Sequence, residues 1–149
     1  MPGRGSGHTS GGRAVEFRVP ARTEALAVVR AMTSCLADYE GLDGETAANL
    51  ALAVDEACTV LIGMSAPGAA LVVEEDPHAH ELTVRISAVC DSVHGDPGTA
   101  VLSGFSRRVL QALTERVETF VDDTDFERTA VATPALGIAL TVRRRWAMA

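Results

Sequence analysis

Two adjacent carboxylates, Asp55 and Glu56, interrupt an otherwise apolar stretch of the sequence over residues 50–65. If this stretch is a helix, Glu56 points away from the apolar stripe that contains Leu50 and Val54, because it lies six and two positions beyond them. One interpretation is that both carboxylates lie on the solvated rim of a half-buried helix. The other is that Glu56 projects into a cleft, where it could orient or deprotonate a hydroxyl nucleophile.

The other residues that could do chemistry give weaker signals. His78 and His80 form a His-x-His pattern in a turn-rich segment without a nearby cysteine, which favours a surface turn over a metal site. His94 lies close to Asp91, but the glycine-rich segment around them favours solvated side chains. Thr59 has no histidine near it in the sequence, and a threonine in a helix usually bonds the preceding turn. We therefore predict no metal site and no nucleophilic threonine.

The composition of the 149-residue chain excludes one class of partner. A chain of this length fits one domain, which buries roughly 68–70% of its unfolded surface. The formal net charge is -7, and all 20 acidic residues lie between Glu16 and Glu127. This excludes nucleic acid as a direct partner. All 13 basic residues are arginine, so guanidinium and backbone N–H groups would have to hold any phosphate in place of lysine.

The cysteines indicate a reducing compartment. Cys35, Cys58 and Cys90 are odd in number, widely spaced and set in apolar sequence, which argues against a disulfide framework or a zinc site. We interpret them as reduced thiols of a cytoplasmic protein. The sequence suggests no apolar run near the 18 or so residues that a membrane span needs. Residues 1–13 also lack the apolar segment of a signal peptide, so we expect a protein that is neither exported nor bound to a membrane.

The hydrophobic pattern predicts the elements that position these residues. Residues 1–13 are rich in glycine and serine, which predicts a disordered tail before a single domain over 14–146. Asp43 or Thr46 can cap the helix that carries the acidic pair. The predicted strands are 15–19, 70–75, 81–89, 116–123 and 137–145, and the predicted helices are about 22–39, 45–64 and 105–114. Short links between strands favour an α+β fold, a two-layer α/β sandwich with a mixed, mostly antiparallel sheet and helices on one face.

The letters LALAVDEACTVLI, residues 50–62, resemble the first motif of the small Bergerat-fold ATPase domains, the histidine-kinase/Hsp90-like group. They are most similar to the RsbW-like anti-sigma factors, which double as serine protein kinases. That family has Glu-Ala-x-Thr-Asn, in which the Glu is the catalytic base and the Asn holds the magnesium of ATP. The matching residues are Glu56, Ala57, Thr59 and Val60. The resemblance implies that Glu56 is the candidate base, whereas Val60 offers Mg²⁺ no oxygen ligand.

Two further segments match the nucleotide-binding motifs of that family in position. The letters ISAVCDSVHGDPG fall where the family has a strand ending in Asp-x-Gly-x-Gly, and Asp91, Gly95 and Gly98 are the nearest matches, at altered spacing. The letters LSGFSRRVLQAL fall where the family has a glycine-rich turn into a helix whose N-terminus receives the phosphates. Gly104 and Arg107 are the matching residues there. The resemblance implies that ATP binds these five residues, weakly or residually, with an incomplete magnesium site.

The resemblance covers residues 14–145 and is strongest to the degenerate RsbW/UsfX-type anti-sigma factors of the actinobacterial kind. It implies that the chain sequesters an alternative sigma factor of the stress or sporulation type and is released by a STAS-domain anti-anti-sigma factor. The alternative is an active ATP-dependent serine protein kinase that phosphorylates this antagonist. The missing Asn favours the binding function and leaves open whether the chain is an enzyme. The resemblance also implies a homodimer paired through the sheets.

The resemblance places the sigma contact on the first predicted helix. Its apolar stripe, which should face the core, is Leu26, Val29, Met32 and Leu36. Arg22, Glu24 and Arg30 then remain outside, available to a partner. Sigma factors use basic surfaces to hold promoter phosphates, so the acidic middle of this chain would offer them complementary charge.

Overall fold

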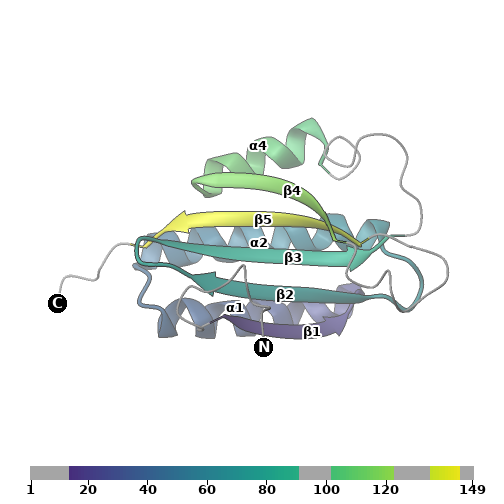
Figure 1. Ribbon diagram of the computed structural model, residues 1–149, viewed down its shortest axis with the longest axis horizontal. Helices are drawn as coiled ribbons and strands as arrows, with labels where there is room; N and C mark the ends of the chain where they lie inside the picture. The colour runs from purple at the N-terminus through teal and green to yellow at the C-terminus, as the bar shows by residue number, and fades with distance from the viewer. Residues whose placement is uncertain (1–13, 91–101, 123–134, 145–149) are drawn as a thin grey trace, which may run out of the picture.

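The computed structural model describes residues 14–90, 102–122 and 135–144 (Figure 1). The strands are β1 (Val15–Pro20), β2 (Ala70–Pro77), β3 (Glu81–Val89), β4 (Arg116–Asp122) and β5 (Ala135–Arg143). The helices are α1 (Leu26–Tyr39), α2 (Gly44–Met64) and α4 (Gly104–Leu113), with a 3-10 helix at Thr23–Ala25. Every predicted helix and strand is therefore confirmed. The predicted disordered tail, residues 1–13, lies outside the described residues, so the tail and the limits of the domain stay predictions.

The strands form one sheet in the order β1-β2-β3-β5-β4, and all four pairings are antiparallel. β2 and β3 form the predicted hairpin, with Leu71 opposite Ala88 and Pro77 opposite Leu82. β5, the last strand in the chain, lies between β3 and β4. The centre of the sheet therefore joins strands that are far apart in the sequence.

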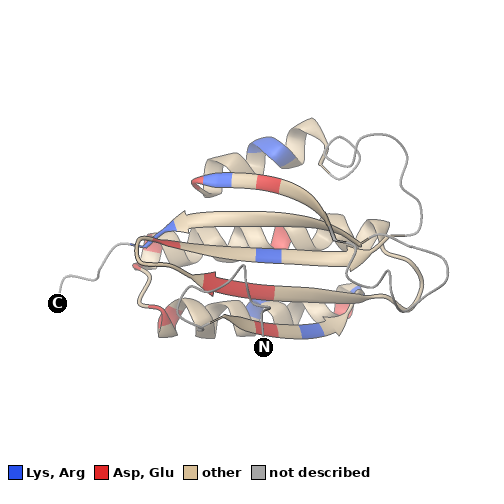
Figure 2. Ribbon diagram, in the orientation of Figure 1, with Lys and Arg blue, Asp and Glu red and all other residues tan. Residues whose placement is uncertain are grey.

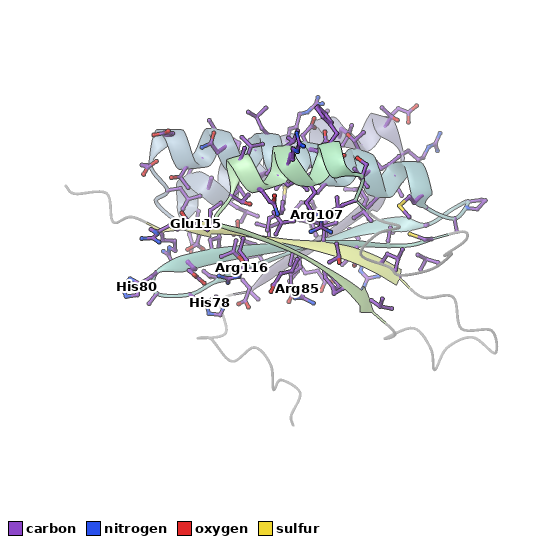
Figure 3. The ribbon with its side chains drawn as sticks, turned by 90° about the horizontal axis from the view of Figure 1, so that it is seen from above. His78, His80, Arg85, Arg107, Glu115 and Arg116 are labelled. Carbon is purple, nitrogen blue, oxygen red and sulfur yellow. The ribbon has the colours of Figure 1, made fainter. Side chains whose placement is uncertain are left out.

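All three α-helices lie on one face of the sheet, as the view from above shows (Figure 3). The strand residues that face them are apolar, and Leu82, Ile86 and Ile138 are all 0% exposed. α2 is the central helix of this layer, since it contacts α1, α4 and the sheet. This arrangement confirms the predicted α+β sandwich of two layers, but the described sheet is entirely antiparallel and not mixed.

α2 is the most apolar helix of the described fold. It begins at Asp43, whose Oδ1 accepts a hydrogen bond from the Thr46 N–H at 2.8 Å, so the first of the two predicted caps is confirmed. α2 has 21 residues, and an 18-residue window within it has a mean hydropathy of 1.5, so by length and composition it could cross a membrane. The expectation that no apolar run approaches this length was wrong. In this fold one side of α2, which includes Leu50 and Leu61, is buried in the core, whereas Leu52 is 59% exposed.

The buried face of α1 differs from the predicted stripe, and the buried face of α4 includes a polar residue. The buried residues of α1 are Leu26, Val29, Thr33 and Ala37. The sequence pattern places Met32 and Leu36 in the core, but both are only half-buried. On α4, Phe105 is 75% exposed, whereas Ser106 and Leu110 are buried. A polar residue therefore occupies the core side of α4.

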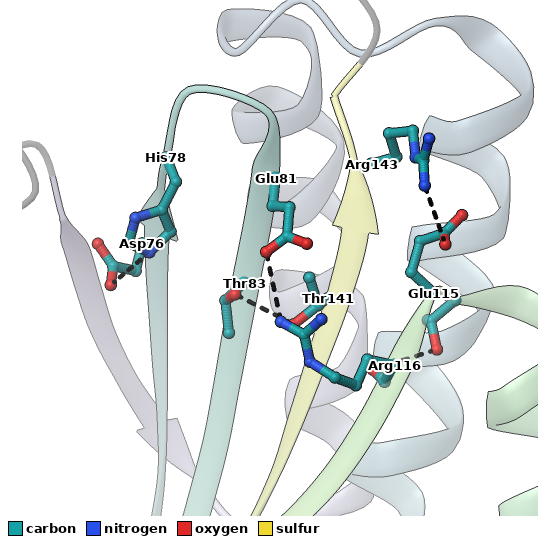
Figure 4. Close-up of polar contacts among 9 residues, drawn as sticks. Asp76, His78, Glu81, Thr83, Glu115, Arg116, Thr141 and Arg143 are labelled. Carbon is teal, nitrogen blue, oxygen red and sulfur yellow. Dashed lines mark hydrogen bonds and ion pairs between the residues drawn. The ribbon is translucent and has the colours of Figure 1, made fainter.

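The opposite face of the sheet carries Arg85 and Arg116, which point away from the helices (Figure 3). Arg116 Nη2 lies 3.3 Å from Glu81 Oε1, and the hydroxyl groups of Thr83 and Thr141 are 3.1 Å apart (Figure 4). These contacts link β3 to β4 and β3 to β5. Polar pairs therefore connect the adjacent strands β3 and β5 and also span β5 from β3 to β4 on this face, which we call the open face.

One aromatic ring covers part of the open face. Phe120 on β4 is paired with Gly137 on β5, and its ring occupies the space that a side chain at residue 137 would need. The guanidinium carbon of Arg85 lies 4.1 Å from the centre of the same ring, a cation–π distance. Gly137 thus allows a stack of three residues from three strands.

Candidate functional site

The acidic pair connects α2 to the two helices beside it. Glu56 Oε2 accepts a hydrogen bond from Ser106 Oγ of α4 at 2.9 Å. Asp55 Oδ1 accepts a hydrogen bond from Arg30 Nε of α1 at 2.8 Å. One carboxylate therefore holds α4 and the other holds α1, which gives each a structural role on the helix between them.

The two contacts differ in their exposure to solvent. The side chains of Arg30 and Asp55 are 58% and 31% exposed, and the hydrogen bond to Asp55, followed by its charge, raises the pKa of Arg30. An ion pair this exposed contributes little to stability, so Asp55 fits the solvated-rim interpretation. Ser106, in contrast, is 8% exposed. The hydroxyl bonded to Glu56 is therefore withdrawn from water and depends on that carboxylate.

The sequence interpretation missed Ser106. α4 begins after Ser103, whose Oγ accepts a hydrogen bond from the Ser106 N–H at 3.1 Å. A serine before a helix is a typical N-cap, so the spacing of the two serines was an available signal for where α4 begins. Nothing in the hydrophobic periodicity marks a buried serine, because the pattern records only apolar residues.

The predicted nucleotide-binding residues are only partly described. Those outside the described residues are Asp91, Gly95 and Gly98. Gly104 is the first residue of α4, and Arg107 is labelled on the same helix in Figure 3. The structure therefore brings these two residues to the helix end that also carries Ser106. One N–H group of this helix end already bonds Ser103, which leaves fewer donors for a phosphate.

The remaining motif positions present no metal ligand. Thr59 Oγ1 donates a hydrogen bond to the Asp55 carbonyl oxygen at 2.9 Å, which confirms the predicted bond to the preceding turn. Val60 packs against the core, and its side chain has no oxygen for Mg²⁺. In the parts of the chain that the structure describes, no three His, Cys, Asp or Glu side chains are grouped to hold a metal ion.

The positions of His78, His80 and Cys58 in the fold give each of them a structural explanation. His78 and His80 are exposed at the turn between β2 and β3 (Figure 3), which confirms the interpretation as a surface turn. His78 Nε2 lies 3.3 Å from Asp76 Oδ2 (Figure 4). Burial, and then the charge of Asp55, raise the pKa of Cys58 to about 12. The Cys58 thiol therefore stays protonated and is a poor nucleophile.

A separate cleft of about 190 Å³ opens where α2 begins and where α4 and β5 end. The charged residues of its lining are Asp43, Glu45, Glu115 and Arg143. Carboxylates outnumber the guanidinium here, and Arg143 Nη2 already lies 3.7 Å from Glu115 Oε1 (Figure 4). Excess negative charge repels phosphate groups, so this cleft does not suit a nucleotide.

Comparison with known proteins identifies the family. No model of a protein family matches the sequence. The chain is 41% identical over 138 residues to the anti-sigma-F factor RsbW of Mycobacterium tuberculosis, in strain CDC 1551 / Oshkosh and equally in strain ATCC 25618 / H37Rv. Each alignment covers 93% of this chain and 78% of the relative. The chain therefore belongs to the RsbW family of anti-sigma factors.

Proposed function

We propose that this protein is an anti-sigma factor that sequesters an alternative sigma factor of the stress or sporulation type. The anti-sigma function is supported by 41% identity over 93% of the chain to relatives of that name. A STAS-domain anti-anti-sigma factor completes the proposal as the partner that releases the sigma factor. The activity is thus capture and release of a protein that controls transcription, in the cytoplasm.

The hydrogen bond between Ser106 and Glu56 is the observation that favours binding over phosphoryl transfer. A general base must lie within about 2.6–3.2 Å of the group whose proton it takes. The Glu56 carboxylate instead bonds a hydroxyl of its own chain at 2.9 Å. Val60 adds a second reason, because phosphoryl transfer depends on a metal that a valine cannot hold. The second candidate, an ATP-dependent serine protein kinase, is supported by the presence of Glu56 itself.

The first test concerns nucleotide. We expect Mg-ATP to bind with a dissociation constant above about 0.1 mM, which corresponds to less than about 5.5 kcal/mol of binding free energy, because Val60 replaces a metal ligand. Isothermal titration calorimetry with and without magnesium measures this constant, and incubation of a STAS partner with radiolabelled ATP measures phosphorylation. Low-micromolar binding that needs magnesium, or stoichiometric transfer of the label, would support the kinase instead.

The proposed sigma-binding surface is the outer side of α1 and the residues just before it. The side chains of Arg22 and Glu24 are 73% and 81% exposed, and Val28 on α1 is 50% exposed. Specific interfaces bury about 800 Å² on each partner and combine apolar with charged groups. This surface offers both kinds of group along α1 and the 3-10 helix that precedes it.

The second test concerns the sigma factor. We expect direct binding without ATP and an association rate that falls at least about tenfold between low and high salt, because the charge of -7 attracts a basic partner. Surface plasmon resonance against each alternative sigma factor of the source genome measures the rate. Val28→Asp should weaken binding, and Gly63→Ala, a change in open space at the far end of α2, is the matched control. If no sigma factor is retained in low salt, the capture function is refuted.

A homodimer paired through the sheets is also part of the proposal. The open face supports it because it is the sheet face opposite the helix layer (Figure 3). Its cross-strand pairs, such as Glu81 with Arg116, provide polar groups for a second copy. Analytical ultracentrifugation of the free protein measures the oligomeric state.

A further inference from the structure

One arginine and two buried carboxylates meet where α1 ends. Glu40, which directly follows α1, has a side chain that is 2% exposed, and Arg144 Nη2 lies 3.2 Å from its Oε1. Glu75 on β2 is also 2% exposed, and it belongs to the acidic end of that strand, drawn red in Figure 2. When all three side chains are ionised, this cluster carries one uncompensated negative charge.

Arg144 connects three parts of the fold. Its backbone N–H donates to the His80 carbonyl at 2.8 Å, and its Nη1 donates to the His78 carbonyl at 2.8 Å. Its Nη2 also donates to the carbonyl oxygen of Glu40 at 3.2 Å. The residue that follows β5 therefore fastens the β2–β3 turn to the end of α1. This connection depends on a single guanidinium.

One carboxyl oxygen of Glu75 has no hydrogen-bond partner among the residues that the structure describes. This atom, Oε1, is buried, and the neighbours of Glu75 in the sheet are Val15 on β1 and Val84 on β3. A buried polar atom without a partner is costly, and an ionised carboxylate in that position is more costly still. A bound proton removes this charge, so the geometry favours the neutral form of Glu75.

The charged groups around Glu75 are few. Strand alternation places the charged neighbours of β1, β2 and β3 on the open face, away from it: Glu16, Arg18, Glu74, Asp76 and Arg85. On α2, Glu45 is exposed, and the acidic pair has partners on α1 and α4. Among the described residues, the charges that act on Glu75 are those of Glu40 and Arg144. Burial, followed by the charge of Glu40, raises the pKa of Glu75 to about 7, against the opposing effect of Arg144.

We propose that Glu75 is a proton-dependent latch that controls how firmly Arg144 holds the end of α1 and the β2–β3 turn. With the proton bound, Glu75 carries no charge and does not compete with Glu40 for the guanidinium. When the proton leaves, a second buried carboxylate repels Glu40 and competes for Arg144. The contacts of Arg144 to Glu40 and His78 then weaken, so the end of α1 and the β2–β3 turn are held together less firmly near neutral pH.

The direction of the pH effect follows from proton binding in the two states. The folded-state pKa of Glu75, about 7, lies above the ordinary value of 4.5, so the folded protein binds more protons than the unfolded chain between these values. Stability therefore falls as pH rises through this window. One proton corresponds to about a tenfold fall in the folding equilibrium constant per pH unit. Below the window the contribution is fully retained.

The variant Glu75→Gln tests the latch, because an amide imitates the protonated acid and cannot ionise. Urea unfolding at pH 5.5, 6.5 and 8 measures the folding equilibrium constants of the wild type and of Glu75→Gln. From pH 5.5 to 6.5 the constant of the wild type should fall by about tenfold relative to that of the variant. Glu74→Gln, a neighbour on the open face, is the matched control and should follow the wild type. Equal pH dependence of wild type and Glu75→Gln overturns the proposal.

A second measurement needs no variant to fold. Carbon-13 NMR of the glutamate carboxyl groups in the wild type should show one resonance, assigned to Glu75, that titrates near pH 7. Amide hydrogen exchange at Arg144, whose N–H donates to the His80 carbonyl, and at Glu40 should accelerate at least about tenfold more between pH 6 and 8 than exchange in the centre of β3, after correction for the intrinsic rate. A Glu75 resonance that titrates near 4.5, or uniform exchange, contradicts the latch.

Discussion

We expect Gly137→Val to lower the free energy of unfolding by about 3 kcal/mol, at the upper end of the cost of overfilling a packed site. In the β4–β5 register Gly137 lies opposite Phe120. A Cβ atom at residue 137 would overlap three atoms of the Phe120 ring. The ring would have to leave the strand surface, and its contact with the guanidinium of Arg85 at 4.1 Å would be lost with it. Urea denaturation measures the change.

The same substitution in a Phe120→Ala protein identifies the cause of the lost stability. In a Phe120→Ala protein, the same change at Gly137 should cost less than about 1 kcal/mol, because the overlapping ring is gone. Gly63→Ala is the control for adding a methyl group where nothing lies within 4 Å. In a helix this control change should be neutral or stabilising. If Gly137→Val costs as much with Ala at residue 120, the ring is not the reason for the glycine.

Replacement of Glu56 by alanine should cost about 2 kcal/mol, the range for a hydrogen bond to a charged group. The reason is that the Ser106 hydroxyl, in a residue 8% exposed, would lose its acceptor at 2.9 Å. For a domain of this size the melting temperature should fall by more than about 5 °C. Differential scanning calorimetry measures the shift. A smaller shift supports the interpretation of Glu56 as a candidate base whose role is chemical only.

The variant Glu56→Gln separates the two roles of this residue. Glutamine keeps an oxygen that can accept from Ser106, so stability should stay within about 1 kcal/mol of the wild type. An amide cannot take a proton, so phosphorylation of a STAS partner by the wild type would disappear in this variant. Ser106→Ala together with Glu56→Ala should cost little more than either change alone, because both remove the same bond.

The sequence predicted the strands and α2 well because their signals are local. Alternation in β2 and β3 and a capping aspartate before α2 are properties of neighbouring residues. The buried face of α4 was not predicted, since Ser106 faces inward and Phe105 is 75% exposed. That arrangement arises from a contact with Glu56, 50 positions earlier. Periodicity cannot detect a polar contact between distant segments.

The candidate site was predictable to a similar extent. Glu56 was identified from its unusual apolar surroundings, and Val60 from its position in the motif. The partners of the acidic pair, Arg30 and Ser106, depend on how three helices pack together. The net charge of the sequence also fails to indicate the raised pKa of Glu75. The charged environment of this residue is created by Glu40 and Arg144, which lie 35 and 69 positions away. Tertiary packing, and not composition, decides these surroundings.

The place of β5 has a consequence for synthesis on the ribosome. β5 pairs with β3 along residues 135–143 and with β4 along 135–141, yet it is translated after both of these strands. Until it emerges, β3 and β4 each expose an edge whose N–H and C=O groups have no strand partner, and such edges invite pairing with other chains. Nascent chains of this protein should therefore be most prone to aggregate after β4 has emerged and before β5 emerges, and a chaperone that covers these edges would act in that interval.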